Sequence, residues 1–213
     1  MIERDSLGRF QKLRISLSPT KKLGYACGLI AGDGCIYRYT KTRNHLVYFV
    51  STKKEFISLA KNAMTKIGLH PFLRERVVTR RFPNGTVKTD LHYILISNSK
   101  ILYEALIPFM RPKSPWHVPN FLTTNDSLLG FLEGIYDAEG SVGSHQVTLF
   151  SKFRESLEML SKILERFLIP TRIYIKHGGF DLHIGRRFYL EKFSKLVNFR
   201  LSWKKKKLEE ILS

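Results

Sequence analysis

One stretch occurs twice in this chain of 213 residues, as GYACGLIAGDG at residues 24–34 and as GFLEGIYDAEG at residues 130–140. A constant separation of 106 residues relates the two copies. Small residues recur at every fourth position, as Gly24, Gly28 and Gly32 in the first copy and as Gly130, Gly134 and Ala138 in the second. At helical spacing they form one stripe, along which two helix backbones can approach closely. Because a glycine within a helix costs about 1 kcal/mol relative to alanine, the repeated stripe predicts a tight crossing of two helices.

Each copy ends in an acid followed by a glycine, Asp33-Gly34 and Glu139-Gly140. A glycine just past the last turn is the usual left-handed helix stop. The acid has the wrong sign there, because a helix C-terminus carries partial negative charge. If the helices pack through their stripes, both carboxylates meet at one end and repel each other unless a cation binds. A lone Asp-Gly indicates an ordinary turn, but the repeated placement favours a divalent metal site.

The composition is that of a globular protein with a large positive charge. Hydrophobic residues make up 43% of the chain, and 36 Lys and Arg against 18 Asp and Glu give a net charge of +18. Such an excess indicates a polyanionic partner or an anionic surface. No apolar run approaches the ~20 residues of a membrane-spanning helix, and we see no apolar signal region, so we expect an intracellular protein without a membrane anchor. Cys27 and Cys35 indicate neither a disulfide framework nor a zinc site.

The order of expected elements repeats around the two stretches. In the first half we expect a helix to residue 32, a hairpin over 35–51, a helix over 53–67, a long hairpin over 72–97 and a helix over 99–109. In the second half we expect a helix over 127–138, a hairpin over 141–151, a helix over 153–167, a short hairpin over 171–184, a helix over 188–199 and a closing basic helix over 203–212. The sequence therefore predicts an α+β chain of two repeats, 1–110 with a basic N-terminal arm and 127–213, joined by a Pro-rich linker over 111–126.

The expected strands carry much of the basic charge. Arg172, Tyr174 and Lys176 alternate with two isoleucines, and Arg74, Arg76 and Arg80 share a face of the long hairpin. A sheet with an apolar back and a front of Arg, Lys and Tyr fits a nucleic-acid groove, although a solvated charged face is the ordinary alternative. The expected nucleic-acid contacts are Tyr37, Tyr39, Lys41, Arg74, Arg76, Arg80, Lys88, Arg172, Tyr174, Lys176 and His183.

Residues 26–34, ACGLIAGDG, and 132–140, LEGIYDAEG, resemble the two LAGLIDADG motifs of the monomeric homing endonucleases. The resemblance covers nearly the whole chain, because the order of elements also fits. It implies a pseudo-twofold protein whose motif helices form the domain interface and whose two four-stranded antiparallel sheets form a saddle over the DNA major groove. It also implies that the acid in the eighth motif position binds Mg²⁺, or another divalent ion such as Mn²⁺.

In this chain the eighth position is Asp33 in the first copy and Glu139 in the second, and the expected metal site includes the adjoining Gly32 and Ala138. Asp137 holds the sixth position, which is not the metal acid in the family, and Ala31 stands there in the first copy.

The resemblance further implies a basic residue near each scissile phosphate, just after the third helix of each repeat. Lys113 fits this pattern in the first repeat. In the second, the run of lysines over 204–207 leaves the counterpart open; we take Lys204, and a solvated basic face is the alternative for most of the run. A polar residue near the attacking water is implied at Thr52 and Ser151.

The implied function is that of a monomeric, Mg²⁺-dependent, site-specific double-strand DNA endonuclease with a long asymmetric target. Phosphodiester hydrolysis needs an activated water, charge neutralisation and support for the leaving oxygen. Asp33 and Glu139 with metal, and Lys113 and Lys204 as cations, are the expected catalytic groups. An RNA-splicing maturase, a non-cleaving DNA-binding regulator and a structural RNA-binding protein stay open as alternatives, and so does an intron-encoded or an intein origin.

Overall fold

A computed structural model describes residues 15–39 and 44–213, so Lys41 and most of the expected N-terminal arm lie outside the described residues. The helices are α1 (Lys21–Gly32), α2 (Lys54–Lys66), α3 (Lys100–Leu106), α4 (Asn125–Glu139), α5 (Arg154–Arg166), α6 (Arg187–Leu196) and α7 (Ser202–Leu212). The strands are β1 (Gly34–Tyr39), β2 (Asn44–Ser51), β3 (Phe72–Arg81), β4 (Val87–Asn98), β5 (Gly140–Val142), β6 (Val147–Ser151), β7 (Arg172–Lys176) and β8 (Gly179–Ile184).

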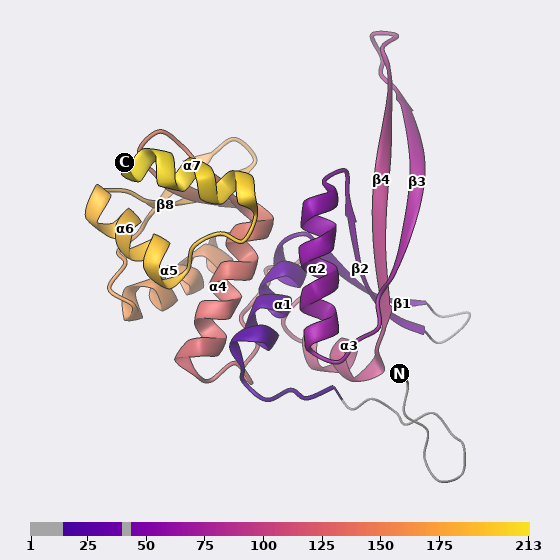
Figure 1. Cartoon of the computed structure of the whole chain (residues 1–213), viewed down its shortest axis with the longest axis horizontal. Coiled ribbons are helices and arrows are strands. Elements are labelled where there is room, and N and C mark those ends of the chain that lie inside the picture. The colour runs from indigo at the N-terminus through magenta and orange to yellow at the C-terminus, as the bar shows by residue number, and fades with distance from the viewer. Residues whose placement is uncertain (1–14, 40–43) are drawn as a thin grey trace.

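The two predicted repeats are present. Each begins with a motif helix and continues through a hairpin, a helix, a second hairpin and a helix, and α7 is added at the end of the second repeat. Each repeat forms one antiparallel four-stranded sheet, ordered β1-β2-β4-β3 in the first and β5-β6-β8-β7 in the second. Figure 1 shows α1 and α4 side by side at the centre, with the other elements of the two repeats to either side. This arrangement confirms the predicted fold class.

Several helix boundaries differ from the sequence prediction. The helix α3 ends at Leu106, three residues before the predicted end. The helix α4 begins at Asn125, two residues before the predicted start, because Thr124 caps it: the Thr124 side chain accepts a hydrogen bond of 3.2 Å from the amide of Ser127. The helix α6 ends at Leu196, before the predicted end at Phe199, because Asn198 adopts a left-handed backbone with φ of 58°. The chain turns there and leads into α7.

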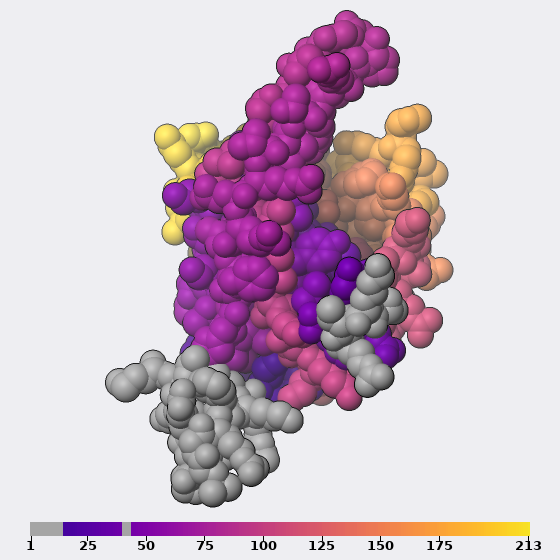
Figure 2. Space-filling view, turned by 90° about the vertical axis from the view of Figure 1, so that its right-hand side faces the viewer, coloured from indigo at the N-terminus to yellow at the C-terminus, as the bar shows by residue number. Residues whose placement is uncertain are grey.

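The second hairpins differ in length between the repeats. β3 and β4 have 10 and 12 residues, whereas β7 and β8 have five and six. Figure 2 shows the β3–β4 ribbon standing out from the body of the molecule. Gly85 and Gly178, both with φ of 79°, lie in the turns that close the two hairpins, where a side chain would be strained.

The buried apolar residues pack between the sheets and the helices. Phe49 and Leu95 contribute from the first sheet, and Leu149 and Leu182 from the second. Among the described helices, none combines the length and apolar character needed to span a bilayer. The buried apolar residues hold one sheet on each side of the α1–α4 pair.

Candidate active site and nucleic-acid interface

The two motif helices touch through their backbones. A Cβ atom on Gly28 would collide with the carbonyl oxygen of Phe131, and one on Gly134 would collide with the carbonyl oxygen of Tyr25. A Cβ on Gly32 would meet the Cβ of Ala138. The stripes therefore face each other, as predicted, and the last turns of both helices come together at one end of the crossing.

The glycines after the acids have a different role from the predicted left-handed stop. Gly140 has φ of −69° and ψ of 148°, which any residue can adopt, and Gly34 is not among the residues with positive φ. Instead, a Cβ on Gly140 would collide with the carbonyl oxygen of Tyr136, and one on Gly34 would lie 2.5 Å from the Cα of Ile30. Glycine is needed because each strand leaves directly against the last helical turn.

The carboxylates of Asp33 and Glu139 lie at the joined ends of α1 and α4. Both side chains are exposed to solvent, but the surrounding protein raises the pKa of each carboxyl by desolvation. The negative charge of Asp33 raises the pKa of Glu139 further, and the ammonium of Lys204 opposes both shifts. The structure thus brings these three predicted site residues within electrostatic range of one another.

Lys204 occupies the C-terminal end of α4. It is 3% exposed, and its Nζ donates to the carbonyl oxygens of Tyr136 at 3.1 Å, Asp137 at 2.6 Å and Ala138 at 3.3 Å. A cation in this place is stabilised by the partial negative charge of the helix terminus. Burial lowers the pKa of Lys204 to about 8, and the charges of Asp137, Asp33 and Glu139 act in the opposite direction.

The other members of the lysine run, residues 205–207, are exposed on α7. The structure therefore separates Lys204 from its three neighbours, which sequence alone did not. The reason is the helical period: residue 204 shares the inner face of α7 with Leu208, which is also buried.

Lys113 lies in the loop after α3 and is placed differently from Lys204. Its backbone is left-handed, with φ of 62°, and its side chain is exposed. Together with Ile30, Ala31 and Gly34 at the end of α1, it lines a cavity of about 200 Å³. Lys113 is thus beside the end of the first motif helix.

Asp137, at the motif position that is not the metal acid in the family, lies in the last turn of α4 and is completely buried. Its Oδ2 accepts a hydrogen bond of 2.8 Å from the hydroxyl of Tyr25 in the other repeat, and its Oδ1 accepts from the amides of Arg200 at 3.0 Å and Leu201 at 3.1 Å. Sequence reasoning missed Tyr25 and Arg200 in this network. The available signal was that two acids four residues apart, Glu133 and Asp137, interrupt the mostly apolar part of α4.

Of the two polar residues expected near the attacking water, Ser151 is buried, and its Oγ accepts a hydrogen bond of 3.1 Å from the amide of Phe153. Ser51 makes the same bond to the amide of Lys53, also at 3.1 Å. The structural counterpart of Ser151 is therefore Ser51 and not Thr52, and both serines stabilise the turn between a strand and the next helix.

The first sheet presents one basic face. Strand pairing opposes Arg76 to His92 and Arg80 to Lys88, and the alternation of side chains puts Arg74 on the same face. Tyr37 and Tyr39 point away from the core through β1, with 48% and 41% of their surface exposed. The contacts predicted in this half that the structure describes thus share one surface, which continues onto the β3–β4 ribbon, and Lys41 lies outside the described residues.

The second sheet has a shorter basic face. Arg172 pairs with His183 and Tyr174 with Asp181, so these side chains lie on one face with Lys176. Asp181 is buried and forms an ion pair of 2.5 Å with Lys176, which partly neutralises that lysine. The opposite face of β7 is not packed along its whole length as expected, because Ile175 near the strand end is 82% exposed.

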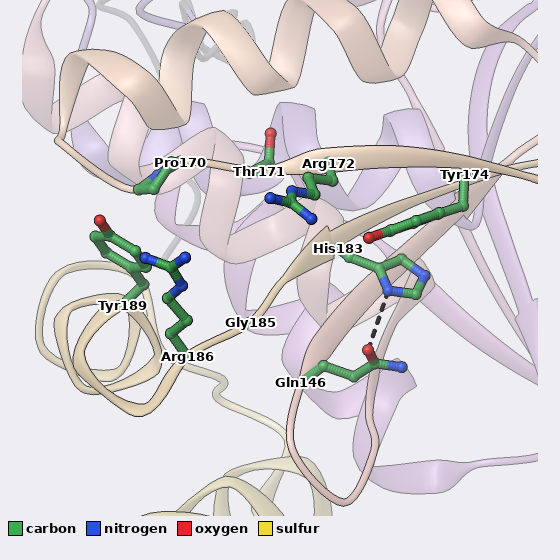
Figure 3. A pocket seen from close by; sticks show the side chains of 9 residues that line it. All are labelled: Gln146, Pro170, Thr171, Arg172, Tyr174, His183, Gly185, Arg186 and Tyr189. Carbon is green, nitrogen blue, oxygen red and sulfur yellow. Dashed lines mark hydrogen bonds between the residues drawn. The ribbon is translucent and has the colours of Figure 1, made fainter.

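A cavity of about 400 Å³ opens beside this face, between β7, the end of β8 and the start of α6. Figure 3 shows the side chains of Arg172, Arg186, Tyr189 and His183 around it. His183 is held by a hydrogen bond of 3.0 Å between its Nδ1 and the Oε1 of Gln146. Among the residues that the structure describes, no acidic side chain lines the cavity, so its two guanidinium groups make it suited to an anion. Sequence reasoning missed Arg186 and Tyr189.

The family model described as LAGLIDADG-like domain matches residues 20–106 and 126–198. The chain belongs to the LAGLIDADG family. The two matched segments correspond to the two structural repeats of this LAGLIDADG protein.

Known proteins agree with this assignment. Homing endonuclease I-ApeI of Aeropyrum pernix is 29% identical over 206 residues, which cover 89% of this chain and 88% of that protein. The homing endonuclease I-WcaI, solved bound to its DNA recognition sequence, superposes with a TM-score of 0.67 at 18% identity and covers 91% of this chain and 87% of its own. I-DmoI, solved in complex with DNA and Mn, gives 0.56 at 19% identity, covering 85% and 97%.

The donor set at the helix ends fits a divalent ion of the hard, oxygen-binding kind. Asp33 and Glu139 supply carboxylates, and desolvation together with the negative charge of Asp33 raises the pKa of Glu139. Within residues 15–39 and 44–213, no cluster of three or more His, Cys, Asp or Glu side chains could hold a metal. An ion in this LAGLIDADG protein would therefore depend on these two acids.

Proposed function

We propose that this LAGLIDADG protein is a Mg²⁺-dependent, site-specific double-strand DNA endonuclease. The observation that carries the proposal is the meeting of Asp33, Glu139 and Lys204 at the ends of the crossed motif helices, between two sheets with basic faces. The net charge of +18 favours a polyanionic substrate. I-ApeI, a named homing endonuclease at 29% identity, supports the same activity.

Asp33 and Glu139 would hold the metal, with Gly32 and Ala138 adjoining it. A bound Mg²⁺ or Mn²⁺ supplies charge neutralisation and a more acidic water for phosphodiester hydrolysis. I-DmoI has been solved with DNA and Mn, and a variant of I-DmoI has been solved with its target DNA in the presence of Mg, which supports either ion. Lys204 holds a positive charge beside the two acids, and Lys113 supplies a second cation at the end of α1.

The sheets would position the DNA. Arg74, Arg76, Arg80 and Lys88, with Tyr37 and Tyr39, are the proposed contacts to the first half-site, and Lys41 remains part of this proposal. Arg172, Tyr174, Lys176 and His183 are the proposed contacts to the second. Because the two faces differ in length and in residues, we propose a monomer on an asymmetric target.

The proposal is tested by selecting a binding site from a randomised DNA library and then measuring cleavage of that site with Mg²⁺, with Mn²⁺ and with EDTA. We expect the wild-type protein to cut both strands only with a metal ion. Asp33→Asn and Glu139→Gln should each reduce the cleavage rate by about 10³-fold or more while retaining specific binding, because these acids are proposed to hold the metal and not the DNA.

Glu104→Gln is the matched control, because Glu104 is an exposed acid that pairs with Lys100 on the same helix. It should leave cleavage unchanged. Specific binding without nicking under any metal condition would overturn the endonuclease proposal and favour a non-cleaving DNA-binding protein. Binding that prefers structured RNA would favour a maturase.

A further inference from the structure

Asp137 ties the last turn of α4 to the start of α7. Its carboxylate accepts hydrogen bonds from the amides of Arg200 and Leu201, at 3.0 and 3.1 Å through Oδ1. Leu201 is the N-cap residue of α7 and makes no side-chain cap bond itself, while the carboxylate of Glu55 accepts a hydrogen bond of 2.6 Å from the amide of Ser202. Asp137 is fully buried, so water does not compete with these bonds. The carboxylate thus fixes the backbone at which α7 starts.

The side chain of Arg200 fixes the same turn from outside. Its guanidinium lies 3.8 Å above the ring of Tyr25, and its Nε donates to Glu133 at 3.1 Å. Glu133 also pairs with Lys21 at the start of α1. The turn is therefore held by both motif helices.

Lys204 lies three residues after Leu201, within the first turn of α7. From there its Nζ returns to the end of α4 and donates to the carbonyl oxygen of Asp137 itself at 2.6 Å. Asp137 therefore takes part at both ends of the connection. Its carboxylate accepts hydrogen bonds from the backbone at the start of α7, and its carbonyl oxygen accepts one from Lys204 of α7. The position of the ammonium beside Asp33 and Glu139 follows from this closed loop of contacts.

The first repeat lacks this connection. Ala31 stands 106 residues before Asp137, and its methyl group accepts no hydrogen bond. Lys113 is exposed, in a left-handed loop above the cavity of about 200 Å³ at the end of α1. The corresponding place in the second repeat is filled by the ammonium of Lys204. The two cations of the candidate site are therefore unequally prepared before DNA binds.

We propose that Asp137 is a positioning residue that holds Lys204 at the end of α4, and that this makes the strand served by Lys204 the first to be cut. The inference rests on the proposed endonuclease function. Cleavage then proceeds through an intermediate nicked in that strand, because the centre served by Lys113 must first order its loop.

The test uses the selected target with a different label on each strand, under single-turnover conditions with Mg²⁺. Lys204→Met and Lys113→Met first establish which strand each lysine serves. Asp137→Ala should then slow the Lys204 strand by about 100-fold, which is the effect of a small misplacement, and the other strand by less than about threefold. In the wild type, the intermediate should be nicked in the Lys204 strand.

A double-mutant cycle separates positioning from general damage. If Asp137 acts through Lys204, the double variant Asp137→Ala/Lys204→Met should be no slower on that strand than Lys204→Met alone. Asp137→Asn should restore much of the rate, because the amide oxygen still accepts from the amides of Arg200 and Leu201. Leu157→Ala is the control for stability, because Leu157 is a buried core residue of the same repeat without polar contacts; it should slow neither strand selectively.

Amide hydrogen exchange over residues 200–205 gives a readout that needs no cleavage. Asp137→Ala should increase exchange there by at least about tenfold, and Leu157→Ala should not do so selectively. Equal slowing of both strands, additive effects in the cycle, or unchanged exchange would each overturn the proposal. If the wild-type protein cuts no DNA, the proposed endonuclease function is wrong. The amide hydrogen exchange of Asp137→Ala still tests whether Asp137 holds the start of α7.

Discussion

The two repeats share an architecture but divide its tasks unequally. The first extends a ribbon of 10- and 12-residue strands with a row of arginines, and its candidate catalytic lysine, Lys113, is exposed in a loop. The second has strands of five and six residues, a cavity lined by two arginines, and a buried lysine, Lys204, held by three carbonyl oxygens. The first repeat has the longer basic ribbon, and the second repeat has the lysine that is fixed in place beside the acids.

This difference shows that two repeats of one fold can differ in their strands and loops while the crossing of α1 and α4 is kept. The small residues of the helix crossing must be kept in both repeats, because each backbone fills the groove of the other. Loops and ribbon lengths are free to change, because they lie outside that contact. The predictions that follow test this division, beginning with the shared crossing.

The largest effect is expected at the crossing itself. Gly28→Ala places a methyl group against the carbonyl oxygen of Phe131, where neither backbone can move without separating the helices. We expect a loss of more than about 3 kcal/mol in the free energy of unfolding, and Gly134→Ala should behave alike because it faces Tyr25 in the same way. Thermal and urea unfolding measure both variants.

Gly185→Ala is the matched control, because a Cβ there meets no atom within 4 Å and the backbone does not have positive φ. It should unfold at the wild-type temperature. If Gly28→Ala were equally stable, the close crossing would be wrong.

The next largest effect concerns the two lysines. Lys204→Met removes an ordered cation beside the acids, and we expect a loss of about 10²–10³-fold in the cleavage rate of one strand. Lys113→Met removes an exposed cation, so its loss on the other strand should be smaller, about 10-fold. Rates are measured separately on each labelled strand. Lys206→Met, an exposed neighbour on α7, serves as control and should change neither rate.

A moderate effect is expected on DNA binding. Arg76→Ala and Arg172→Ala should each weaken specific binding by about 1–3 kcal/mol if the guanidinium contacts a base edge, and the footprints should change on opposite half-sites. Arg186→Ala, in the cavity of the second repeat, should weaken all sequences alike and reduce the salt dependence by about one phosphate contact. Both are measured by titration at several salt concentrations.

Arg154→Ala is the control for this set, because Arg154 is exposed on α5 and pairs with Glu158 on the same helix. It should alter neither affinity nor salt dependence. Identical footprints for Arg76→Ala and Arg172→Ala would contradict the assignment of one sheet to each half-site.

The smallest effect is expected on the stability of the metal-free protein. Because burial raises the folded-state pKa of Asp33 and Glu139 above the unfolded value of about 4, their ionised forms destabilise the fold. This unfavourable contribution is absent below the unfolded pKa and develops as pH rises through the range between the two values. Glu139→Gln should therefore raise the Tm in EDTA at neutral pH by about 1–3 °C, an effect kept small by solvent screening of the exposed carboxylates.

The same comparison at pH 4 should show almost no difference between Glu139→Gln and the wild type. Adding Mg²⁺ should stabilise the wild type more than the variant, because only the wild type presents both carboxylates. A variant less stable than the wild type in EDTA would indicate that Glu139 has a favourable structural partner and would argue against a repelling pair.

Much of the fold could be predicted because the sequence repeats. The 106-residue separation of the two copies predicts that the motif helices pair. The alternation within residues 172–176 and 74–80 predicts that the basic side chains of each strand lie on one face. The helix caps and ends were less predictable. The capping hydrogen bonds between Thr124 and Ser127 and the left-handed backbone of Asn198 are local features that leave no periodic pattern in the sequence.

By itself, the sequence determined that two small-residue stripes would cross and would bring Asp33 and Glu139 to one end, because helical period and spacing are local properties. Only the tertiary structure decided which lysine of residues 204–207 joins them, and that Asp137, Arg200 and Tyr25 form one buried network. Those contacts join residues far apart in the sequence, 112 positions for Tyr25 and Asp137 and 175 positions for Tyr25 and Arg200, so no local pattern encodes them. Their energy depends on burial, and burial exists only once both repeats have packed.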